Sequence, residues 1–534
     1  MSSNMRRSIK NIATGLLAGL IASLAMTLVM ALARYLLGIA TPAELFGDRI
    51  APTFNPGEFL QLLQQFGGYN ELKQAGVSSV LAGQIVVGTL GGALYAYIVE
   101  RNKSAGRVWH YGISLRGLIF ASVFVGLFWV VSLIVLWPVL ETSYLGFPPA
   151  WAARANIAGL LIAYACYGAA LLFVYRFMTS SEHIKERAPA SKAPAMGLPI
   201  KRRIFIASSA GLVVAAATAA LLYKLFQLAT FSYDGKQYIG PDVQPITPAE
   251  DFYTVTKNVI DPDVAKTVWR LEVTGMVERP IDYSYEDLRA LPVTTQETTL
   301  MCISNWVGGG LMSNAVWKGI PLRHLIEAAG PRPGVVEVMF RAVDGYTDTI
   351  PFEKAMDPST FVAYEMNDAP LAQSHGFPAR ILVPGMYGEK SVKWVTRIEL
   401  VDHDAKGFYE QQGWGPDFVV PTRSRFDFPY YDQAIKFQPV VTLKGIAFGG
   451  DRGVSRVEVT TDGGGAWTEA KIVYPGSRLT WALWSYDWRP AQPGEYKLIV
   501  RATDGAGALQ IADDRSTVPQ GATGYHRVTV RLEA

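Results

Sequence analysis

Cysteine is nearly absent from this chain: Cys166 and Cys302 are the only two among 534 residues, so no framework of disulfides can be built. The chain also has little net charge, because 49 Lys and Arg residues nearly balance 46 Asp and Glu residues and leave a formal net charge of +3. The second half of the chain has no stripe of basic residues interleaved with aromatic residues, and nucleic-acid binding is therefore excluded. Cys302 needs an explanation other than cross-linking.

Histidine is scarce as well. The chain has six histidines, and none of them lies inside the long apolar runs of the first 230 residues. A membrane cytochrome needs histidines within its helices to bind haem, and a c-type haem needs a Cys-x-x-Cys-His motif, which is missing from the sequence. The sequence predicts no haem.

Long apolar runs, in contrast, fill the first part of the chain. A helix crosses the hydrocarbon core of a membrane with about 20 apolar residues. Five runs reach that length: about Ile12 to Leu37, Val77 to Val99, Leu115 to Leu140, Ile157 to Phe177 and Ile204 to Phe226. We expect a four-span region over residues 1–200 and a fifth span within residues 201–230.

Basic residues predict the orientation of these spans, because short loops retain Lys and Arg on the cytoplasmic side. Arg6, Arg7 and Lys10 precede the first span. Arg101, Lys103 and Arg107 lie in the second connection. The fourth connection contains Lys185, Arg187, Lys192, Lys201, Arg202 and Arg203. With the amino terminus inside and an odd number of spans, everything after about Phe231 is expected outside the cytoplasm, in a periplasm or its equivalent.

Two segments beside the membrane carry further signals. Lys201-Arg202-Arg203-Ile204-Phe205-Ile206 resembles a twin-arginine export signal, although its arginines would also serve as ordinary positive-inside anchors. The stretch from Pro42 to Gly76 places Phe59-Leu60 and Leu62-Leu63 beside Gln and Glu. This pattern predicts an amphipathic helix that contacts membrane lipid on the outer surface.

From Pro241 the pattern changes to short strand-like runs joined by turns. Val268 to Val273 alternates polar and apolar residues, as a half-buried strand does. Short helices are expected over Tyr285–Leu291 and Leu322–Ala329, because the first opens with acidic residues and the second ends at Gly-Pro. Residues 241–432 are therefore expected to form a mixed α+β domain.

Residues 433–534 are expected to be purely β. Val454 to Val459 alternates, Asp462 to Gly465 forms a turn, and Trp481–Trp488 and Tyr496–Arg501 have the composition of further strands. About seven short strands in a hundred residues are typical of an immunoglobulin-like sandwich.

The segment from Thr299 to Trp306 carries the strongest chemical signal. It places Cys302 after an expected strand and before the glycines Gly308 to Gly310. A lone thiol packed in a core is the plain alternative.

Three elements further on indicate an anionic cofactor site: Asp344-Gly345-Tyr346, His375 to Arg380, and Pro384 to Trp394. Arg380, Lys390 and Lys393 would neutralise a phosphate, and the loop around Gly388 would let backbone N–H groups approach it.

In this order, the motifs resemble those of the sulfite oxidase family of molybdopterin oxidoreductases, over about residues 245–534. The matching elements are Phe252–Asn258, the Trp269 strand that ends at Gly275, the cysteine segment, Trp317–Leu322, the Asp-Gly-Tyr triplet at Asp344, the His-Gly-x-Pro-x-Arg element from His375, and Lys393-Trp394. The pattern is most similar to that of the membrane-anchored bacterial members. In relatives of these members, the C-terminal β-sandwich is named a dimerisation domain.

The resemblance implies one pyranopterin that holds a molybdenum centre, with the thiolate of Cys302 as the only protein ligand of the metal, a role that suits a soft ligand. It implies that the pterin and its phosphate are held by Tyr253, Thr256, Lys257, Asn258, Asp344, His375, Arg380, Ser391, Val392 and Lys393. From the residues alone, His375 has an alternative as a loop histidine bonded to backbone, and Asp344 has one as the cap of a turn.

The departures from the family pattern bear on the substrate. Sulfite-oxidising relatives place arginines in the opening segment and just after the cysteine, where they neutralise the oxyanion, but here these positions hold Thr256 and Trp306-Val307. The opening segment also ends in Asn258 where many relatives carry histidine. Methionine sulfoxide reductases of the same superfamily lack those arginines too, but they also lack the sandwich and pair with a separate haem subunit. Neither activity transfers to this chain.

We therefore expect a molybdenum-cofactor enzyme of a bacterial cytoplasmic membrane that performs two-electron oxygen-atom transfer on a small substrate, with the metal cycling between Mo(VI) and Mo(IV). A quinone or a cytochrome would exchange single electrons with it, and the resemblance implies a homodimer.

Trp306 and Tyr387 are candidate walls of the substrate pocket, with core packing as the alternative for each. Two other interpretations are a non-enzymatic receptor or scaffold, and a transporter, which the scarcity of charges within the spans disfavours.

Overall fold

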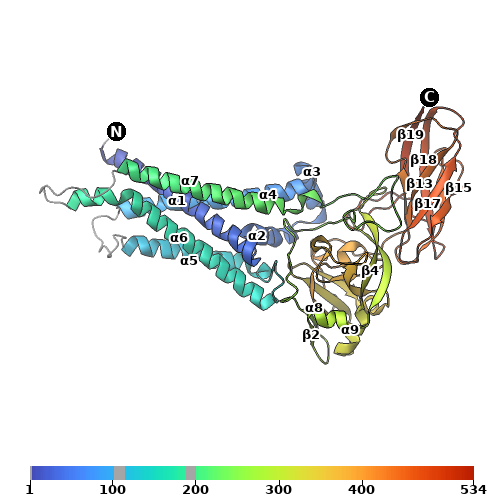
Figure 1. Cartoon of the computed structure of the whole chain (residues 1–534), viewed down its shortest axis with the longest axis horizontal. Coiled ribbons are helices and arrows are strands. Elements are labelled where there is room, and N and C mark those ends of the chain that lie inside the picture. The colour runs from blue at the N-terminus through green and yellow to red at the C-terminus, as the bar shows by residue number, and fades with distance from the viewer. Residues whose placement is uncertain (1–2, 102–114, 188–199) are drawn as a thin grey trace. The chain divides into compact units, whose positions relative to one another are not determined.

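The computed structural model describes residues 3–101, 115–187 and 200–534 (Figure 1). The chain forms two compact units: unit 1 contains Met1–Ala51 and Gln65–Ala229, and unit 2 contains Pro52–Gln64 and Thr230–Ala534. Three bases on which the predicted orientation depends, Lys103, Arg107 and Lys192, lie outside the described residues.

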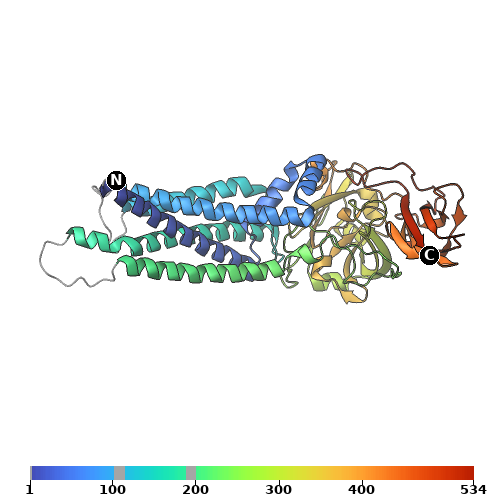
Figure 2. The same ribbon diagram turned by 90° about the horizontal axis from the view of Figure 1, so that it is seen from above.

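Unit 1 is helical. Its helices are α1 (Ser3–Leu37), α2 (Pro42–Ile50), α4 (Tyr69–Arg101), α5 (Leu115–Leu136), α6 (Pro149–Arg187) and α7 (Ile200–Gln227), and the long ones run side by side (Figure 2). All except α2 are long and apolar enough to cross a membrane, over Ile9–Leu37, Tyr69–Val99, Gly117–Val139, Pro149–Thr179 and Arg202–Gln227. The five apolar runs are thus confirmed as helices, although the third ends at Leu136 because Pro138 follows.

Glycines let α1 and α4 approach closely. A Cβ added at Gly19 would lie 2.7 Å from the carbonyl oxygen of Gly88. A Cβ added at Gly15 would lie 2.5 Å from the carbonyl oxygen of Gly92. Small residues at such contacts are typical of helices that pack within a membrane, where close backbone approach replaces hydrophobic burial as the source of attraction.

The first part of unit 2 is a mixed α+β region built on two sheets. One has the strand order β2-β1-β10-β5-β6, from β1 (Leu271–Gly275), β2 (Ile281–Tyr283), β5 (Glu337–Ala342), β6 (Thr347–Pro351) and β10 (Val395–Val401). The other has the order β3-β4-β7-β8, with β9 paired to β7, from β3 (Thr294–Met301), β4 (Met312–Pro321), β7 (Phe361–Met366), β8 (Ala369–Pro370) and β9 (Arg380–Leu382).

Short helices pack on these sheets. They are α8 (Tyr285–Ala290), α9 (Leu322–Ala329) and α10 (Phe352–Met356). The α8 helix begins at a capping box of Ser284 and Asp287, and α9 ends at Gly330, which has φ +72°. Both helices lie where the sequence places them, and their apolar side chains join a core that also includes Trp269 and Phe340.

The C-terminal part of unit 2 consists of two sheets that enclose one core. A four-stranded sheet has the order β11-β13-β17-β16, from β11 (Arg423–Phe428), β13 (Val441–Phe448), β16 (Lys471–Tyr474) and β17 (Ala482–Trp488). A five-stranded sheet has the order β12-β19-β18-β14-β15, from β12 (Gln433–Lys436), β14 (Val454–Thr460), β15 (Thr468–Glu469), β18 (Gly494–Asp504) and β19 (His526–Glu533). The immunoglobulin-like classification of this pair of sheets stays a prediction.

The two parts of unit 2 share structure across the expected boundary at residue 433. Strand β11 precedes that boundary but pairs with β13, so it belongs to the C-terminal sheets. One apolar cluster contains Met301 and Tyr387 from the first part, and Phe448 and Trp481 from the second. The cysteine-bearing segment is therefore packed against both parts.

The segment Pro52–Gln64 belongs to unit 2, although it lies between two apolar helices in the sequence. It includes most of α3 (Pro56–Phe66), which confirms the expected amphipathic helix in this stretch. The ring of Phe59 packs against the apolar cluster that contains Met301 and Trp414. Phe59 therefore contacts protein, whereas lipid contact by the rest of the stretch stays a prediction.

Candidate functional site

Cys302 lies immediately after strand β3, in the interior of unit 2. Its backbone N–H donates to the carbonyl of Leu311 at 3.0 Å, which continues the pairing of β3 with β4 by one more bond. Its Sγ lies 3.0 Å from Ser304 Oγ. Burial, and then the charge of Glu389, raise the pKa of the Cys302 thiol to about 12. A metal that binds this sulfur must displace its proton.

Two arginines of strand β11 hold the loop that follows Cys302. Arg423 Nη1 donates to the carbonyl of Asn305 at 3.0 Å, and Arg425 Nη1 donates to the carbonyl of Gly309 at 2.7 Å. Sequence reasoning missed both residues, because they lie more than a hundred positions from the loop and alternate with polar residues that carry no recognisable motif. The C-terminal sheets thus position the cysteine loop.

Arg380 and Lys393 form a pair of cations that the loop at Gly376 brings together. A Cβ added at Gly376, which has φ +106°, would lie 3.0 Å from Lys393 Cβ and 3.2 Å from Arg380 Cβ. Arg380 donates to the carbonyls of His375 and Ser391 at 3.2 and 3.1 Å, and its Nε has no hydrogen-bond partner within the described ranges. Lys393 Nζ donates to the carbonyl of Ser374 at 3.0 Å.

Neither of these cations has a carboxylate within ion-pair distance in the part of the chain that the structure describes. Burial lowers the pKa of Arg380 to about 10, and burial also lowers the pKa of Lys393, against the opposing charge of Asp261. Buried positive charge without a counter-ion is costly. The pair therefore fits an anionic group such as a phosphate.

Tyr253 connects the cation pair with the cysteine. Its phenol is buried, and its pKa is raised well above the ordinary value by burial and by the charge of Cys302, while the charge of Arg380 acts in the opposite direction. The hydroxyl lies against Gly388, where a Cβ would collide with it. Tyr253 thus lies within electrostatic reach of both the sulfur and the guanidinium.

His375 also faces the cation pair, but its ring is bonded to backbone. Its Nε2 lies 2.8 Å from the carbonyl oxygen of Ala249, and its ring lies edge-on to Phe252. Burial and the charges of Arg380 and Lys393 lower the pKa of His375 to about 4, so the imidazole is neutral near pH 7. The alternative of a loop histidine bonded to backbone therefore describes its contact.

Lys257, Asn258 and Asp344 form one network. Asn258 Nδ2 donates to Asp344 Oδ2 at 2.9 Å, and Lys257 Nζ donates to the carbonyl of Asp344 at 2.9 Å. Asp344 Oδ1 also accepts the N–H of Tyr346 at 3.1 Å, which is the turn-capping role expected as its alternative. The carboxylate of Asp344 is thus occupied by protein donors.

Thr256, Ser391 and Val392 have structural partners. Thr256 Oγ1 donates to Asp261 Oδ1 at 2.7 Å, and Ser391 Oγ accepts the N–H of Val383 at 3.2 Å. Val392 belongs to the core, and its carbonyl accepts the N–H of Ile381. These three residues shape the site, and Val392 can offer a ligand only backbone atoms.

Lys390 corrects one prediction. Its Nζ lies 2.7 Å from Asp348 Oδ1 and 3.1 Å from Glu410 Oε2, and the side chain is 2% exposed. The carboxylates satisfy its charge, so it does not neutralise a phosphate as predicted.

The two candidate pocket walls differ in exposure, since Tyr387 is fully buried and Trp306 is 43% exposed.

Glu389 is a residue that sequence reasoning missed. Its carboxyl oxygens are buried and have no hydrogen-bond partner among the described residues. Burial raises the pKa of Glu389 to about 8, and the charge of Asp348 acts in the same direction. The N–H groups of Glu389 and Ile303 and the charge of Lys390 act in the opposite direction, although neither N–H makes a hydrogen bond of acceptable geometry. A Gly-Glu-Lys sequence ordinarily indicates an exposed turn, so composition gave no signal for a buried acid.

Metal binding at this site would depend on few protein ligands. The structure, over its described residues, contains no group of three or more His, Cys, Asp and Glu side chains that could hold a metal. A metal at Cys302 would therefore need ligands other than a cluster of such side chains. One thiol beside a pair of cations without counter-ions fits a metal carried by an anionic cofactor.

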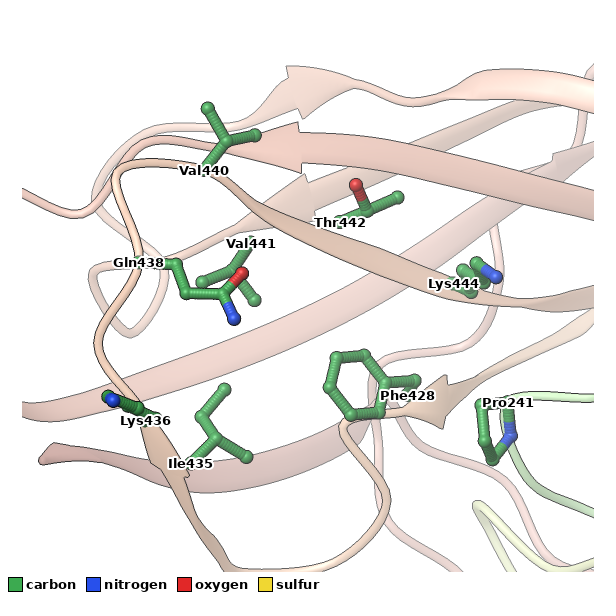
Figure 3. Close-up of a pocket in the computed structure, with 9 residues that line it drawn as sticks. All are labelled: Pro241, Phe428, Ile435, Lys436, Gln438, Val440, Val441, Thr442 and Lys444. Carbon is green, nitrogen blue, oxygen red and sulfur yellow. The ribbon is translucent and has the colours of Figure 1, made fainter.

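A separate groove lies in the C-terminal sheets. It has a volume of about 380 Å³ and is lined by Pro241, Phe428, Ile435, Lys436, Gln438, Val440, Val441, Thr442 and Lys444 (Figure 3). None of these residues belongs to the site at Cys302. Its apolar residues come from the end of β11, the edge strand β12, the start of β13 and the loop at Pro241, beside two lysines.

Two family models match this chain. An oxidoreductase molybdopterin binding domain matches residues 258–409, and a Mo-co oxidoreductase dimerisation domain matches residues 420–533.

Curated relatives match the same half. Mitochondrial sulfite oxidase of Mus musculus is 32% identical over 314 residues, which are 50% of this chain and 57% of the relative. An inducible NADH nitrate reductase of Glycine max is 29% identical over 309 residues, which are 46% of this chain and 35% of the relative. Among solved structures, the sulfane dehydrogenase SoxCD from Paracoccus pantotrophus has 22% identity and a TM-score of 0.49, covering 65% of this chain and 95% of that chain. The chain spans 31% to 59% of the length of these and similar curated relatives.

Proposed function

We propose that this chain, whose second half carries the two domains of sulfite oxidase-type proteins, is a membrane-anchored molybdenum-cofactor oxidoreductase. The domain matches and the sulfite oxidase relatives confirm the predicted resemblance to that family. The activity, the substrate and the partners are the proposal, because the curated relatives are longer proteins of which this chain covers only part.

The observation that carries the proposal is the combination of the Cys302 thiol with the cations Arg380 and Lys393. A soft sulfur ligand suits molybdenum, and two cations without counter-ions suit the phosphate of a pterin. Tyr253 lies within electrostatic reach of both groups, so one elongated cofactor would contact all of them.

The residues of the chain would bind and orient this cofactor. Arg380 and Lys393 would neutralise its phosphate, the Asn258–Asp344 network would fix the neighbouring wall, and Cys302 would ligate the metal. When bound, the cofactor supplies two-electron chemistry in which a substrate gains an oxygen atom from water and releases two electrons and two protons, or the reverse. The buried position of Cys302 would keep bulk water from the sulfur.

The apolar helices of unit 1 support a membrane anchor. Five helices have the required length and composition, and the predicted positive-inside pattern would place unit 2 outside the cytoplasm. Electrons would then pass singly to a quinone or a cytochrome. A topology reporter fused after Ala534 tests the location: activity of a reporter that works only outside the cytoplasm supports it, and activity only of a cytoplasmic reporter contradicts it.

The dimerisation-domain match supports a homodimer through the C-terminal sheets. The edge strand β12 and the groove beside it offer an unpaired surface for such a contact (Figure 3). Light scattering of the detergent-solubilised chain tests this part of the proposal, and a monodisperse monomer would count against it.

The central test is elemental analysis for molybdenum on the full chain from a host that makes the cofactor. We expect about one molybdenum per chain in the wild type and in Cys166→Ser, and altered metal spectra or metal loss in Cys302→Ser. Cys166 is the matched control because it is the other cysteine and lies in α6. A folded wild-type chain without molybdenum would contradict the proposal of a molybdenum enzyme and favour the interpretation of the chain as a non-enzymatic scaffold.

A further inference from the structure

We propose that Glu389 is a specificity-determining residue of the site at Cys302, and that it selects a small substrate with a hydrogen-bond donor or a positive charge over an oxyanion. The inference rests on the function proposed above and names the class of its substrate. It is carried by a carboxyl group whose two oxygens are buried and have no hydrogen bond of acceptable geometry from any residue that the structure describes.

Glu389 lies next to the segment that carries the cysteine, because the backbone N–H of Ile303 acts on its carboxyl group. The residue lies in the turn Gly388–Lys390, where a Cβ added at Gly388 would lie 3.3 Å from the carbonyl oxygen of Met301, the neighbour of Cys302. The charge of Glu389 acts on the Cys302 thiol and on the Tyr253 phenol. Part of the residue reaches solvent, but both carboxyl oxygens are buried. The carboxyl group therefore lies in the interior that surrounds the sulfur.

The cation whose charge acts on Glu389 is already paired. It is Lys390, and its Nζ lies within ion-pair distance of Asp348 and Glu410. The other titratable groups in electrostatic contact are acids and phenols: Asp348, Cys302, Tyr253, Tyr346, Tyr387 and Tyr409. The arginines behind the cysteine loop, Arg423 and Arg425, donate to backbone carbonyls of that loop.

This arrangement discriminates between ligands by hydrogen-bond complementarity. A buried acceptor without a partner is costly, and a ligand that brings an N–H, an O–H or a cation removes that cost. An oxyanion would instead lose its hydration and bring no donor to the buried oxygens of Glu389. Because burial raises the pKa of Glu389 to about 8, the carboxyl group is mostly protonated near pH 7 and could donate only its single O–H to the anion. Whether or not the carboxyl group is protonated, it supplies no positive charge to an anion.

Methanesulfonamide and methanesulfonate are suitable probes, because they share one skeleton and differ in an NH2 group against an anionic oxygen. Binding of each is measured by calorimetry on the detergent-solubilised full chain loaded with cofactor, after its molybdenum and pterin contents are determined. The wild type should prefer methanesulfonamide by about tenfold, which is within the range for satisfying one buried acceptor that otherwise has no partner. The preference should fall to within about threefold in Glu389→Gln and reverse in Glu389→Lys.

Glu353→Gln, an exposed glutamate of α10, is the control and should keep the wild-type preference. Equal binding of the probes by the wild type, binding of neither, or an undiminished preference in Glu389→Gln would overturn the inference. If Glu389→Lys does not fold, the Gln variant decides. A wild type without molybdenum would instead refute the proposed function, so the two failures are distinguishable.

Discussion

The imidazole of His526 lies directly against Gly308, so that a Cβ on Gly308 would lie 2.5 Å from the ring carbon Cδ2. His526 opens the last strand, β19, and Gly308 follows Cys302 by six residues. The imidazole Nδ1 also accepts the N–H of Phe426 in β11 at 3.0 Å. The last strand of the C-terminal sheets therefore supports the loop that follows the cysteine.

Substitution of Gly308 by alanine should destabilise unit 2. Gly308 has φ +84°, which strains an L residue, and its Cβ would also collide with His526. We expect a loss of about 2–4 kcal/mol in the free energy of unfolding, seen as a lower midpoint of thermal unfolding by tryptophan fluorescence of the solubilised chain. Gly507→Ala isolates the strain, because Gly507 has φ +86° and nothing within 4 Å of its Cβ. Equal losses in the two variants would contradict the collision.

His526 should make stability depend on pH in the acid range. Burial and the charges of Arg425 and Arg423 lower the pKa of His526 to about 4, below the ordinary value near 6.5. The folded protein therefore prefers neutral His526, and this stabilisation is full above about pH 6.5 and is lost as the pH falls toward 4, with a limit of about 3 kcal/mol.

The variant His526→Asn, whose side-chain oxygen can accept the Phe426 N–H, should lose part of this dependence. Unfolding midpoints of both proteins are compared between pH 7.5 and pH 5. His375 titrates in the same range, so the difference between the two proteins is the quantity to measure. Parallel pH profiles for variant and wild type would show that His526 does not contribute.

Helices and strands with apolar periodicity were predictable, and buried charges were not. The apolar runs predicted the five long helices, and acidic residues at the start of one segment and a Gly-Pro stop at the end of the other predicted α8 and α9 to within one residue. Strand β11 was missed because both of its faces are buried, so Arg423, Arg425 and Asp427 do not face solvent as the polar residues of a half-buried strand do.

The ion pair of Arg425 and Asp427 should be essential for stability. Their side chains are 2% and 3% exposed, and the Arg425 Nε to Asp427 Oδ1 distance is 2.9 Å. Arg425→Met would leave a buried carboxylate without its partner and should cost about 3–5 kcal/mol, measured by the unfolding midpoint. Arg425→Met with Asp427→Leu should recover part of this loss.

The exposed pair of Arg527 and Asp514, at 3.0 Å, provides the control. Arg527→Met should cost less than about 1 kcal/mol, because solvent screens a surface pair. A similar loss in Arg425→Met and Arg527→Met would contradict the role given to burial.

The candidate site was partly predictable for a different reason. Motif order drew attention to Cys302, Arg380 and Lys393, and the structure brings Arg380 and Lys393 together. Nothing in the sequence indicated that Lys390 is paired or that the carboxyl group of Glu389 is buried, because both depend on distant segments: Asp348 and Glu410 satisfy the lysine, and the oxygens of the glutamate have no hydrogen-bond partner among the described residues.

Lys393 should affect the empty and the loaded protein in opposite directions. Its ammonium is partly buried beside Arg380, and no carboxylate of the described chain lies within ion-pair distance of it. Lys393→Met removes a charge that is costly without a counter-ion, so chain from a host that lacks the cofactor should unfold at an equal or higher temperature than the wild type. From a cofactor-competent host, the same variant should retain about tenfold less pterin, because a phosphate loses a charged donor. Lys471→Met, at an exposed position of β16, is the control and should change neither the unfolding temperature nor the pterin content. If Lys393→Met keeps its full pterin content, Lys393 does not bind the phosphate. If Lys393→Met strongly destabilises the empty chain, the hydrogen bond from Lys393 to Ser374 matters more than the unpaired charge of Lys393.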